Sequence, residues 1–298
     1  METSKKWNEF ILTRLIKLSG YSAIIFVLMI FYFLLREGIP SIGQVSLSNL
    51  LSIRWYPIED YFGLLPLIGG SILVTIGAAA FAIPIGVCTA VFIAEIAPRW
   101  ARDLLKPLVE VLGGIPSVVL GFLGILILAP ELRQLLTLPT GLTALAGSIL
   151  LGGVAIPTIV SVAEDALDSV PRSYRDAALA LGATPWQTIW KVTLPAARSG
   201  VLTAIMLGIG RAIGETMAVM MVTGNAPVLP VRLNSFVSPI RTMTATIAAE
   251  MGEVAKDSTH YHVLFLIGLV LFLISLGINV AASTAVFKER KRAERILS

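Results

Sequence analysis

Long apolar stretches alternate along this chain with short charged ones, and the alternation sets the first structural expectation. A helix that crosses the hydrocarbon core of a bilayer needs about 20 mostly apolar residues. Six stretches meet this requirement, and we predict a membrane-spanning helix in each. They are residues 18–35, a segment within 61–94, and residues 111–129, 142–162, 200–222 and 263–287. The pattern therefore predicts an all-α membrane protein with six transmembrane helices.

Two features of these stretches require interpretation. Pro84 and Pro116 fall inside predicted spans, where neighbouring helices can satisfy the backbone groups that a proline frees. The first stretch follows several basic residues, as the apolar core of a signal peptide does. Its 18 residues exceed that length, however, and no small-residue cleavage site follows it. We therefore expect a retained first helix.

The distribution of lysine and arginine predicts the orientation of the spans. With a cytoplasmic N-terminus, the inside segments hold 16 basic residues and the outside segments hold 6. Basic residues accumulate in cytoplasmic loops of membrane proteins. Both termini are therefore expected to be cytoplasmic, in a multi-pass protein of a bacterial or archaeal inner membrane.

The composition also indicates that lipid surrounds much of the folded chain. Apolar residues make up 56% of the chain and charged residues only 14%, against about 25% charged in soluble domains. The net charge of +4 does not indicate a nucleic-acid partner, because the basic residues flank apolar spans. His260 and His262 have no third ligand nearby in the sequence, so we predict neither a metal site nor a bound cofactor.

The chain divides into three parts. Residues 1–60 hold the N-terminal cytoplasmic segment, the first helix and an outer loop. Residues 61–287 form a core with five spans and a long cytoplasmic loop at 163–199. Residues 288–298 form a basic cytoplasmic tail.

Two short helices are predicted within the loop at 163–199. Ser173 and Asp176 have the spacing of a capping box, in which each side chain satisfies a backbone N–H at the helix start. The run 177–181 is rich in alanine and leucine and favours helix. Gly182 is placed to end this helix with a positive φ angle.

The second short helix has its own start and stop signals. Thr184 is a favourable N-cap residue, Pro185 suits the first helical position, and Gln187 completes a capping box. Leu194 and Pro195 are expected to end it. The loop then forms an elbow that presents Leu179, Trp186, Ile189 and Trp190. Docking into a partner's groove and lying on the membrane interface are both consistent with such an elbow.

The elbow resembles the coupling loop of bacterial ABC importer permeases. That family's pattern opens with glutamate–alanine–alanine, has a glycine six positions later, and ends in an apolar residue, any residue, leucine and proline. The matching positions here are Asp176, Ala177, Ala178, Gly182, Val192, Leu194 and Pro195. The resemblance implies docking to a separate ATPase. The chain itself has no G-x-x-x-x-G-K-[ST] phosphate loop, so a partner is expected to bind ATP and Mg²⁺.

The fifth predicted span carries a charged pair. Arg211 lies near its middle, where an arginine costs about 2.5–3.5 kcal/mol on insertion scales. Glu215 follows four residues later, so on a continuous helix the two side chains share a face and can pair. A guanidinium suits tetrahedral oxyanions, and a neighbouring carboxylate would compete for it and prevent trapping. A structural ion pair that locks the span to its neighbours is the alternative.

Three further stretches narrow the resemblance to the first permease subunit of the phosphate importer, the PstC type. They are residues 62–71, 114–121 and 210–219. The likeness implies the type I ABC importer permease fold and a substrate pathway at Arg211, Glu215 and Thr216. In that picture Arg211 transiently balances the phosphate charge, and Glu215 holds Arg211 when the site is empty. Met217 and Ala218 favour the first subunit over its sister, in which alanine–proline is expected.

The resemblance also implies partners. They are a second, homologous permease in a heterodimer, two ATPase subunits, an external phosphate-binding protein and membrane lipid. Three alternatives remain open from the residues. These are an ABC permease for another oxyanion such as sulfate or molybdate, a secondary transporter or channel, and a membrane enzyme. The enzyme ranks last, because no nucleophile–base pair, metal triad or paired carboxylates lie in a span.

Overall fold

The computed structural model describes residues 2–297, and helices account for most of them. The long helices are α1 (Glu2–Gly38), α4 (Leu65–Val91), α5 (Arg99–Gly114), α8 (Ala144–Asp168), α12 (Arg198–Gly214) and α15 (Thr259–Leu297). Among the described residues, five helical segments are long and apolar enough to cross a membrane, and a bent pair of helices can supply a sixth. The predicted helical class is thus confirmed.

Shorter elements connect the long helices. On the N-terminal side they are α2 (Pro40–Gln44), α3 (Leu47–Leu50), β1 (Trp55–Tyr56), η1 (Pro57–Glu59) and β2 (Tyr61–Phe62), with β1 and β2 paired antiparallel. Farther along they are the π-helical turn η2 (Phe92–Ile96), α6 (Ser117–Leu123), the π-helical turn η3 (Gly124–Leu128), α7 (Ala129–Leu135), η5 (Leu233–Val237) and α14 (Met243–Glu250). The small hairpin had no sequence signal strong enough to predict it.

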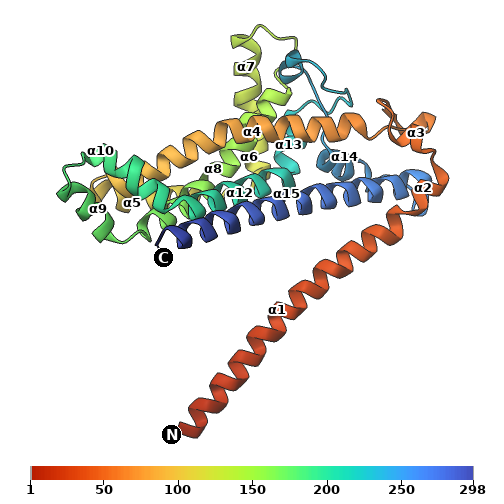
Figure 1. Cartoon of the computed structure of the whole chain (residues 1–298). Coiled ribbons are helices and arrows are strands. Elements are labelled where there is room, and N and C mark those ends of the chain that lie inside the picture. The colour runs from red at the N-terminus through yellow and green to blue at the C-terminus, as the bar shows by residue number, and fades with distance from the viewer. Residues whose placement is uncertain (1, 298) are drawn as a thin grey trace.

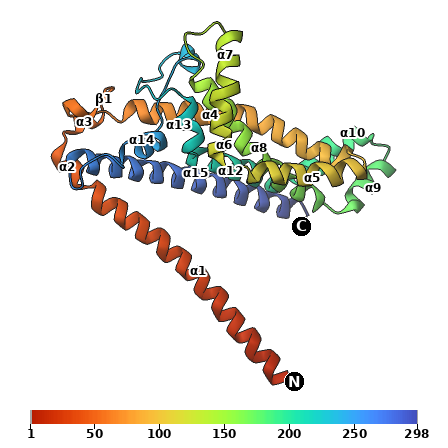
Figure 2. The same cartoon turned by 180° about the vertical axis from the view of Figure 1, so that it is seen from behind.

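The two ends of the molecule differ in what they carry. Helices α4 and α15 run along its long axis (Figure 1). At one end lie the C-terminal end of the chain and the short helices α9 (Arg172–Ala180) and α10 (Pro185–Thr188), and at the other lie α2, α3 and α14. Helix α1 leaves the body at the α2 end and runs back obliquely (Figures 1 and 2).

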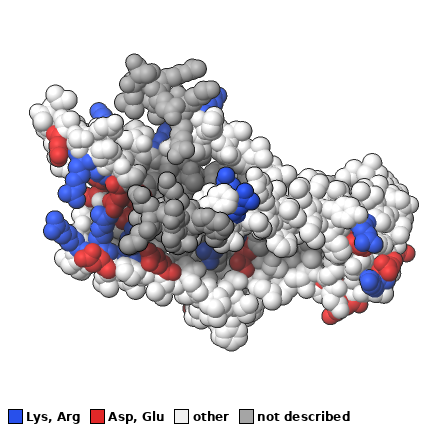
Figure 3. Space-filling model, turned by 90° about the horizontal axis from the view of Figure 1, so that it is seen from below, with Lys and Arg blue, Asp and Glu red and all other residues white. Residues whose placement is uncertain are grey.

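Charged side chains follow the same division. Seen from below, many Lys, Arg, Asp and Glu side chains of the described surface lie toward its two ends, and a few lie between them (Figure 3). Concentration of charge toward the ends is typical of a chain that crosses a bilayer.

The core is built where α4, α8 and α12 cross around Ile159, which is fully buried. A Cβ atom added at Gly86 of α4 would lie 2.8 Å from the Ile159 Cγ2 atom, and one at Gly208 of α12 would overlap its Cγ1 atom. Membrane helices associate through close packing at small residues, because lipid supplies little hydrophobic drive between them. These two glycines therefore allow the three helices to approach one another.

The third predicted span, residues 111–129, is not one helix. Helix α5 ends at Gly114, Ile115 is extended with ψ of 128°, and α6 begins after Pro116. A proline disfavours the helical region for the residue before it and donates no N–H itself. Pro116 therefore interrupts the helix, whereas Pro84 lies inside α4 without breaking it. The apolar segment long enough to span is Ser117–Leu135.

The fifth predicted span, residues 200–222, is interrupted as well. Helix α12 ends at Gly214, Glu215 is extended with ψ of 128°, and α13 (Met217–Val222) begins two residues later. At its other end α12 follows the helical segment Pro185–Ala196 across a bend of 72°. The prediction of one continuous helix was therefore wrong at the position where the site residues lie.

Candidate functional site

The two interruptions lie together. The Arg211 Nη2 atom, near the end of α12, donates to the Gly113 carbonyl at the end of α5 over 2.9 Å. Beyond the breaks, α6 and α13 pack against each other, and a Cβ added at Gly121 would lie 3.1 Å from the Ala218 Cα atom. Interrupted helices place helix ends and unwound backbone at membrane depth, which transporters use to bind ions and substrates. Arg211, Glu215 and Thr216, the predicted pathway residues, therefore lie at or next to an interrupted helix.

Arg211 has neutral partners in this structure. Its second hydrogen bond runs from Nη1 to the Thr158 Oγ1 atom of α8, at 3.2 Å. The ion pairs among the described residues do not include Arg211, and its side chain is exposed. The predicted pair with Glu215 is absent there, because the helix breaks between the two residues and they no longer share a face.

Glu215 and Thr216 form the break itself. One Glu215 carboxylate oxygen, Oε1, accepts the backbone N–H of Thr216 at 3.1 Å and that of Ala218 at 3.3 Å, which caps the start of α13. The Thr216 hydroxyl donates to the Gly214 carbonyl at 3.3 Å, and the Thr244 hydroxyl of α14 donates to the Glu215 carbonyl at 3.1 Å. Both residues stabilise the interruption beside which Arg211 lies.

The elbow forms largely as its local sequence predicts. Gly182 has φ of +82° and ends α9. Thr184 and Gln187 form the expected capping box, with Thr184 N donating to Gln187 Oε1 over 3.0 Å and Gln187 N donating to Thr184 Oγ1 over 3.3 Å. The predicted cap at Ser173 is wrong, because α9 starts two residues earlier and has Pro171 as its N-cap residue.

The end of the elbow differs slightly from the expectation. The helix does not stop at Leu194 but continues through the π-helical turn η4 (Ile189–Thr193) and α11 (Leu194–Ala196) before the bend. Pro195 takes one of the first positions of α11, where it needs no N–H donor. The bend at Ala197 therefore lies two residues beyond the predicted stop at Pro195.

One face of the elbow is exposed and the other is buried. Leu181 is 89% exposed and Trp186 is 58% exposed, whereas Ile189 packs into the bundle. The predicted coupling residues Asp176, Ala177, Gly182 and Pro195 are exposed, and Ala178 and Leu194 are half-buried. Ile189 is thus the one apolar residue of the predicted presenting set that faces inward.

Sequence reasoning missed the ion pair that fixes the elbow to the bundle. Arg175 donates from Nη2 to the Glu95 Oε1 atom at 2.6 Å, and from Nε to both carboxylate oxygens at 3.2 Å. The same guanidinium donates to the carbonyls of Leu167 at 3.0 Å and Val170 at 2.7 Å. Glu95 lies on η2, and no spacing rule relates residues 80 positions apart.

A second ionic cluster joins α5 to α8. Glu164 is almost fully buried and accepts from Arg102 Nη2 at 2.8 Å and from Lys106 Nζ at 2.6 Å. Lys106 also reaches Asp165 at 2.9 Å, and Arg102 contacts Asp168. The four-residue spacing of Arg102 and Lys106, repeated in Glu164 and Asp168, is a signal that could have found this cluster.

The opposite end has a cluster around Glu250 of α14. Its carboxylate accepts from Arg241 Nη1 at 2.7 Å and from Trp55 Nε1 at 3.2 Å, and lies 2.8 Å from His260 Nε2. Burial alone would raise the pKa of the Glu250 carboxyl, but the His260 hydrogen bond, the charge of Arg241 and the Trp55 hydrogen bond together lower it. The cluster ties the β1–β2 hairpin to α14 and α15.

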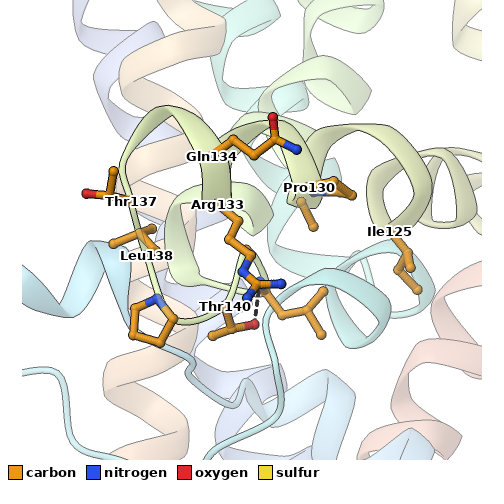
Figure 4. Close-up of a pocket in the computed structure, with 11 residues that line it drawn as sticks. Ile125, Pro130, Arg133, Gln134, Thr137, Leu138 and Thr140 are labelled. Atoms are coloured by element: carbon orange, nitrogen blue, oxygen red, sulfur yellow. Dashed lines mark hydrogen bonds between the residues drawn. The ribbon is translucent and has the colours of Figure 1, made fainter.

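A separate open cavity of about 610 Å³ lies on the connection between α7 and α8. Arg133, Thr137 and Thr140 are among its lining residues, and Leu142 N donates to the Thr140 Oγ1 atom at 3.2 Å (Figure 4). None of the predicted site residues lines this cavity.

Comparison with known proteins assigns the family. Residues 82–293 match the family described as "Binding-protein-dependent transport system inner membrane component", which covers more than half of the chain. The chain belongs to this family. It is therefore a transport component of the inner membrane rather than an enzyme, as predicted.

Curated relatives agree with this assignment. The "Probable ABC transporter permease protein YqgH" of Bacillus subtilis (strain 168) is 43% identical over 235 residues, which cover 78% of this chain and 75% of the relative. The "Phosphate transport system permease protein PstC" of Xylella fastidiosa (strain Temecula1 / ATCC 700964) is 34% identical over 269 residues, which cover 84% of this chain and 81% of the relative. The predicted likeness to PstC-type permeases is thus confirmed.

Solved structures share the fold. A chain of the bacterial alginate ABC transporter, in complex with an alginate pentasaccharide-bound periplasmic protein, matches with a TM-score of 0.64 at 15% identity, covering 93% of this chain and 95% of that one. A chain of the inward-facing MetNI methionine ABC transporter matches with a TM-score of 0.58 at 22% identity. The match covers 74% of this chain and 93% of that one. These likenesses confirm the ABC importer permease fold.

Proposed function

We propose that this chain is one of two permease subunits of an ATP-driven importer that carries inorganic phosphate across the inner membrane. The observation that carries the proposal is Arg211, whose guanidinium lies at two interrupted helices with only neutral partners among the described residues. Relatives named as phosphate transport permeases support phosphate as the cargo.

The chemistry of Arg211 favours an oxyanion. A guanidinium has five N–H donors in a planar fork, and the described contacts to Thr158 and Gly113 use two of them. The remaining donors can bind phosphate oxygens, and the charge is not cancelled by a carboxylate contact. Because Glu215 is engaged in capping α13, we no longer assign it the role of holding Arg211 in this conformation. Its role, with that of Thr216, is to keep the break open beside the guanidinium.

The partners follow from the exposed surfaces and the family. A second, homologous permease would cover the side of the molecule on which Arg211 is exposed, in a heterodimer. Two ATPase subunits would dock on the elbow at the cytoplasmic end, where Leu181 and Trp186 form an apolar contact surface. ATP and Mg²⁺ would bind those subunits and not this chain. A phosphate-binding protein would dock at the opposite, external end.

Uptake of labelled phosphate tests the proposal. Proteoliposomes would contain this chain with its co-purifying subunits, the binding protein outside and ATP inside. We expect ATP-dependent uptake that unlabelled phosphate suppresses and that sulfate and molybdate leave unchanged. Uptake of sulfate or molybdate without phosphate uptake would contradict phosphate as the cargo. The chain would then be an ABC permease for another oxyanion.

Ala178 tests the docking of the ATPase. An aspartate at this half-buried position of the elbow would place a charge in the contact, which is costly when it has no partner. We expect Ala178→Asp to lose both co-purifying ATPase and uptake at normal membrane abundance. Co-purification and stimulated ATP hydrolysis at wild-type levels would refute docking at this surface.

A further inference from the structure

Arg175 connects three separate elements at the elbow end of the molecule. It lies on α9, and its guanidinium binds Glu95 through a fork of contacts of 2.6–3.2 Å. Its other hydrogen bonds go to the carbonyls of Leu167 and Val170, at the end of α8 and just beyond it. A cation is favourable at a helix C-terminus, where backbone carbonyls have no partner within the helix. A single side chain thus joins α9, α8 and the turn that follows α4.

This ion pair is shielded from solvent. The Glu95 side chain is 8% exposed and the Arg175 side chain is 19% exposed. Removal of one member of a buried pair leaves an uncompensated charge, which is far more damaging than loss of a surface pair. Glu95 is held toward α9 by η2, and π-helical turns are frequent at functional sites. The pair therefore fixes the orientation of α9 strongly.

Other charged residues of the same helix do not share this role. Arg172 and Asp176 are exposed, and the described ion pairs of α9 with the bundle consist of Arg175 and Glu95. Arg172 has the same charge on the same helix, one turn earlier. It is therefore a matched control for Arg175.

Contacts continue from this joint to the pathway residue. The end of α8 that accepts from Arg175 also carries Glu164, which binds Arg102 and Lys106 of α5. Gly113 lies in the last turn of α5, and its carbonyl accepts from Arg211. Figure 2 shows α5 and α9 at the same end of the molecule. A contiguous chain of contacts therefore links the elbow to Arg211, as energetic coupling between distant sites can require.

We propose that the Arg175–Glu95 ion pair is the rigid joint through which movement of the docked elbow reaches the spans. Arg175 is then a positioning residue for ATP-driven transport and does not touch the cargo. This inference rests on the proposed function, since it assigns a part of the coupling elbow. Without the joint, α9 can remain docked while its movement is no longer passed to α4 and α8.

A double-mutant cycle in the assembled complex tests the joint. Arg175→Gln, Glu95→Gln, the double variant and Arg172→Gln would be reconstituted with the ATPase subunits and binding protein. The readout is labelled inorganic phosphate imported per ATP hydrolysed, at equal amounts of assembled complex. We expect each single variant of the pair to lower this ratio about tenfold and the double variant to be no worse than either. Arg172→Gln is expected to match the wild type.

Two results would contradict the proposed role of the Arg175–Glu95 pair as a joint. One is an unchanged ratio in Arg175→Gln and Glu95→Gln. The other is a loss of uptake that only follows the loss of assembled complex, which would make the pair a folding element. Arg175→Lys, which keeps the charge and loses the fork, is expected to restore part of the ratio.

Hydrogen exchange separates this inference from the proposed cargo. Amide exchange of residues 172–181 in the complex needs no phosphate. We expect it to rise in Arg175→Gln and Glu95→Gln and to stay at the wild-type level in Arg172→Gln. If the wild-type complex imports no phosphate, the cargo proposal fails while faster exchange still supports the joint. Unchanged exchange in both variants of the pair would reject the joint whatever the cargo is.

Discussion

At the scale of single residues, Arg211 is defined by what surrounds it. Thr158 and Gly113 hold its guanidinium with neutral oxygens, so its positive charge remains available to an anion. The Gly113 carbonyl lies at the C-terminal end of α5, where the helix dipole favours a cation. Thr158 and Gly113 thus fix the position of the Arg211 guanidinium. Neither neutralises its charge, as a carboxylate would, so neither competes with a bound anion.

Replacement of Arg211 by glutamine is expected to abolish phosphate uptake. Glutamine can still donate a hydrogen bond, but it loses the charge and the fork of donors. Membrane abundance and co-purification of the ATPase are expected to remain normal. The measurement is uptake in proteoliposomes, with Arg133→Gln as a control at another exposed arginine. Wild-type uptake by Arg211→Gln would leave Arg211 a structural role only.

The lowered pKa of Glu250, which lies at the end of the molecule opposite the elbow, leads us to predict that the stability of the fold depends on pH. The pKa of its carboxyl lies below the ordinary value of 4.5, despite burial, because of His260, Arg241 and Trp55. A carboxyl with a lowered folded-state pKa stabilises the fold above its unfolded pKa, and this contribution is lost as the pH falls through the folded pKa.

We therefore expect Glu250→Gln to lower the Tm in detergent at neutral pH. The difference in Tm from the wild type should narrow as the pH falls below about 4.5. Thermal unfolding at several pH values measures it, and Glu59→Gln, at an exposed surface pair with Arg54, is the control. A difference that stays constant as the pH falls from 7 to well below 4.5 would contradict the assignment.

At the scale of elements, local signals specify the elbow well and its attachment poorly. The turn at Gly182 and the capping box at Thr184 depend on neighbouring residues, so the sequence predicts both. The prediction of a cap at Ser173 failed because Pro171 occupies the N-cap and the helix starts two residues earlier. The contact of Arg175 with Glu95 depends on how distant segments meet, which no local pattern encodes.

Gly182→Ala tests the turn of the elbow. A Cβ at this position meets no atom within 4 Å, so the expected cost comes from the positive φ alone and is about 1–2 kcal/mol. We expect weaker co-purification of the ATPase and a lower rate of uptake. Gly153→Ala is the control, because Gly153 is also open but lies in α8 without a positive φ. Equal losses in both variants would refute the role of the turn.

At the scale of the whole molecule, apolar periodicity predicts where the chain crosses the bilayer but not where a span is interrupted. Residues 18–35 and 263–287 fall within single helices, and the stretch 142–162 lies in α8 except for its first two residues, since only length and apolarity matter there. The break after Arg211 could not be foreseen, because Glu215 is stabilised by the amides of α13 and by Thr244 on α14. The contact with Ala218 is local, but the contact with Thr244 exists only once distant elements have packed.

The last prediction concerns the source of energy for transport. The chain has an exposed elbow at one end and a charged residue, Arg211, between interrupted helices, and we infer that another subunit must drive transport. This chain alone in proteoliposomes is therefore expected to import no phosphate, with or without a phosphate or proton gradient. Addition of the second permease, the ATPase subunits, the binding protein and ATP is expected to restore uptake.

The same vesicles discriminate between the classes of transporter. A secondary transporter or channel would carry phosphate down or against a gradient without any ATPase, because its pathway is complete in itself. Gradient-driven uptake by the chain alone would therefore overturn the ABC assignment of the mechanism. Uptake that requires ATP, with about tenfold less phosphate imported per ATP in Arg175→Gln, would instead place the energy input at the elbow, and α8 and α5 would be the path by which it reaches Arg211.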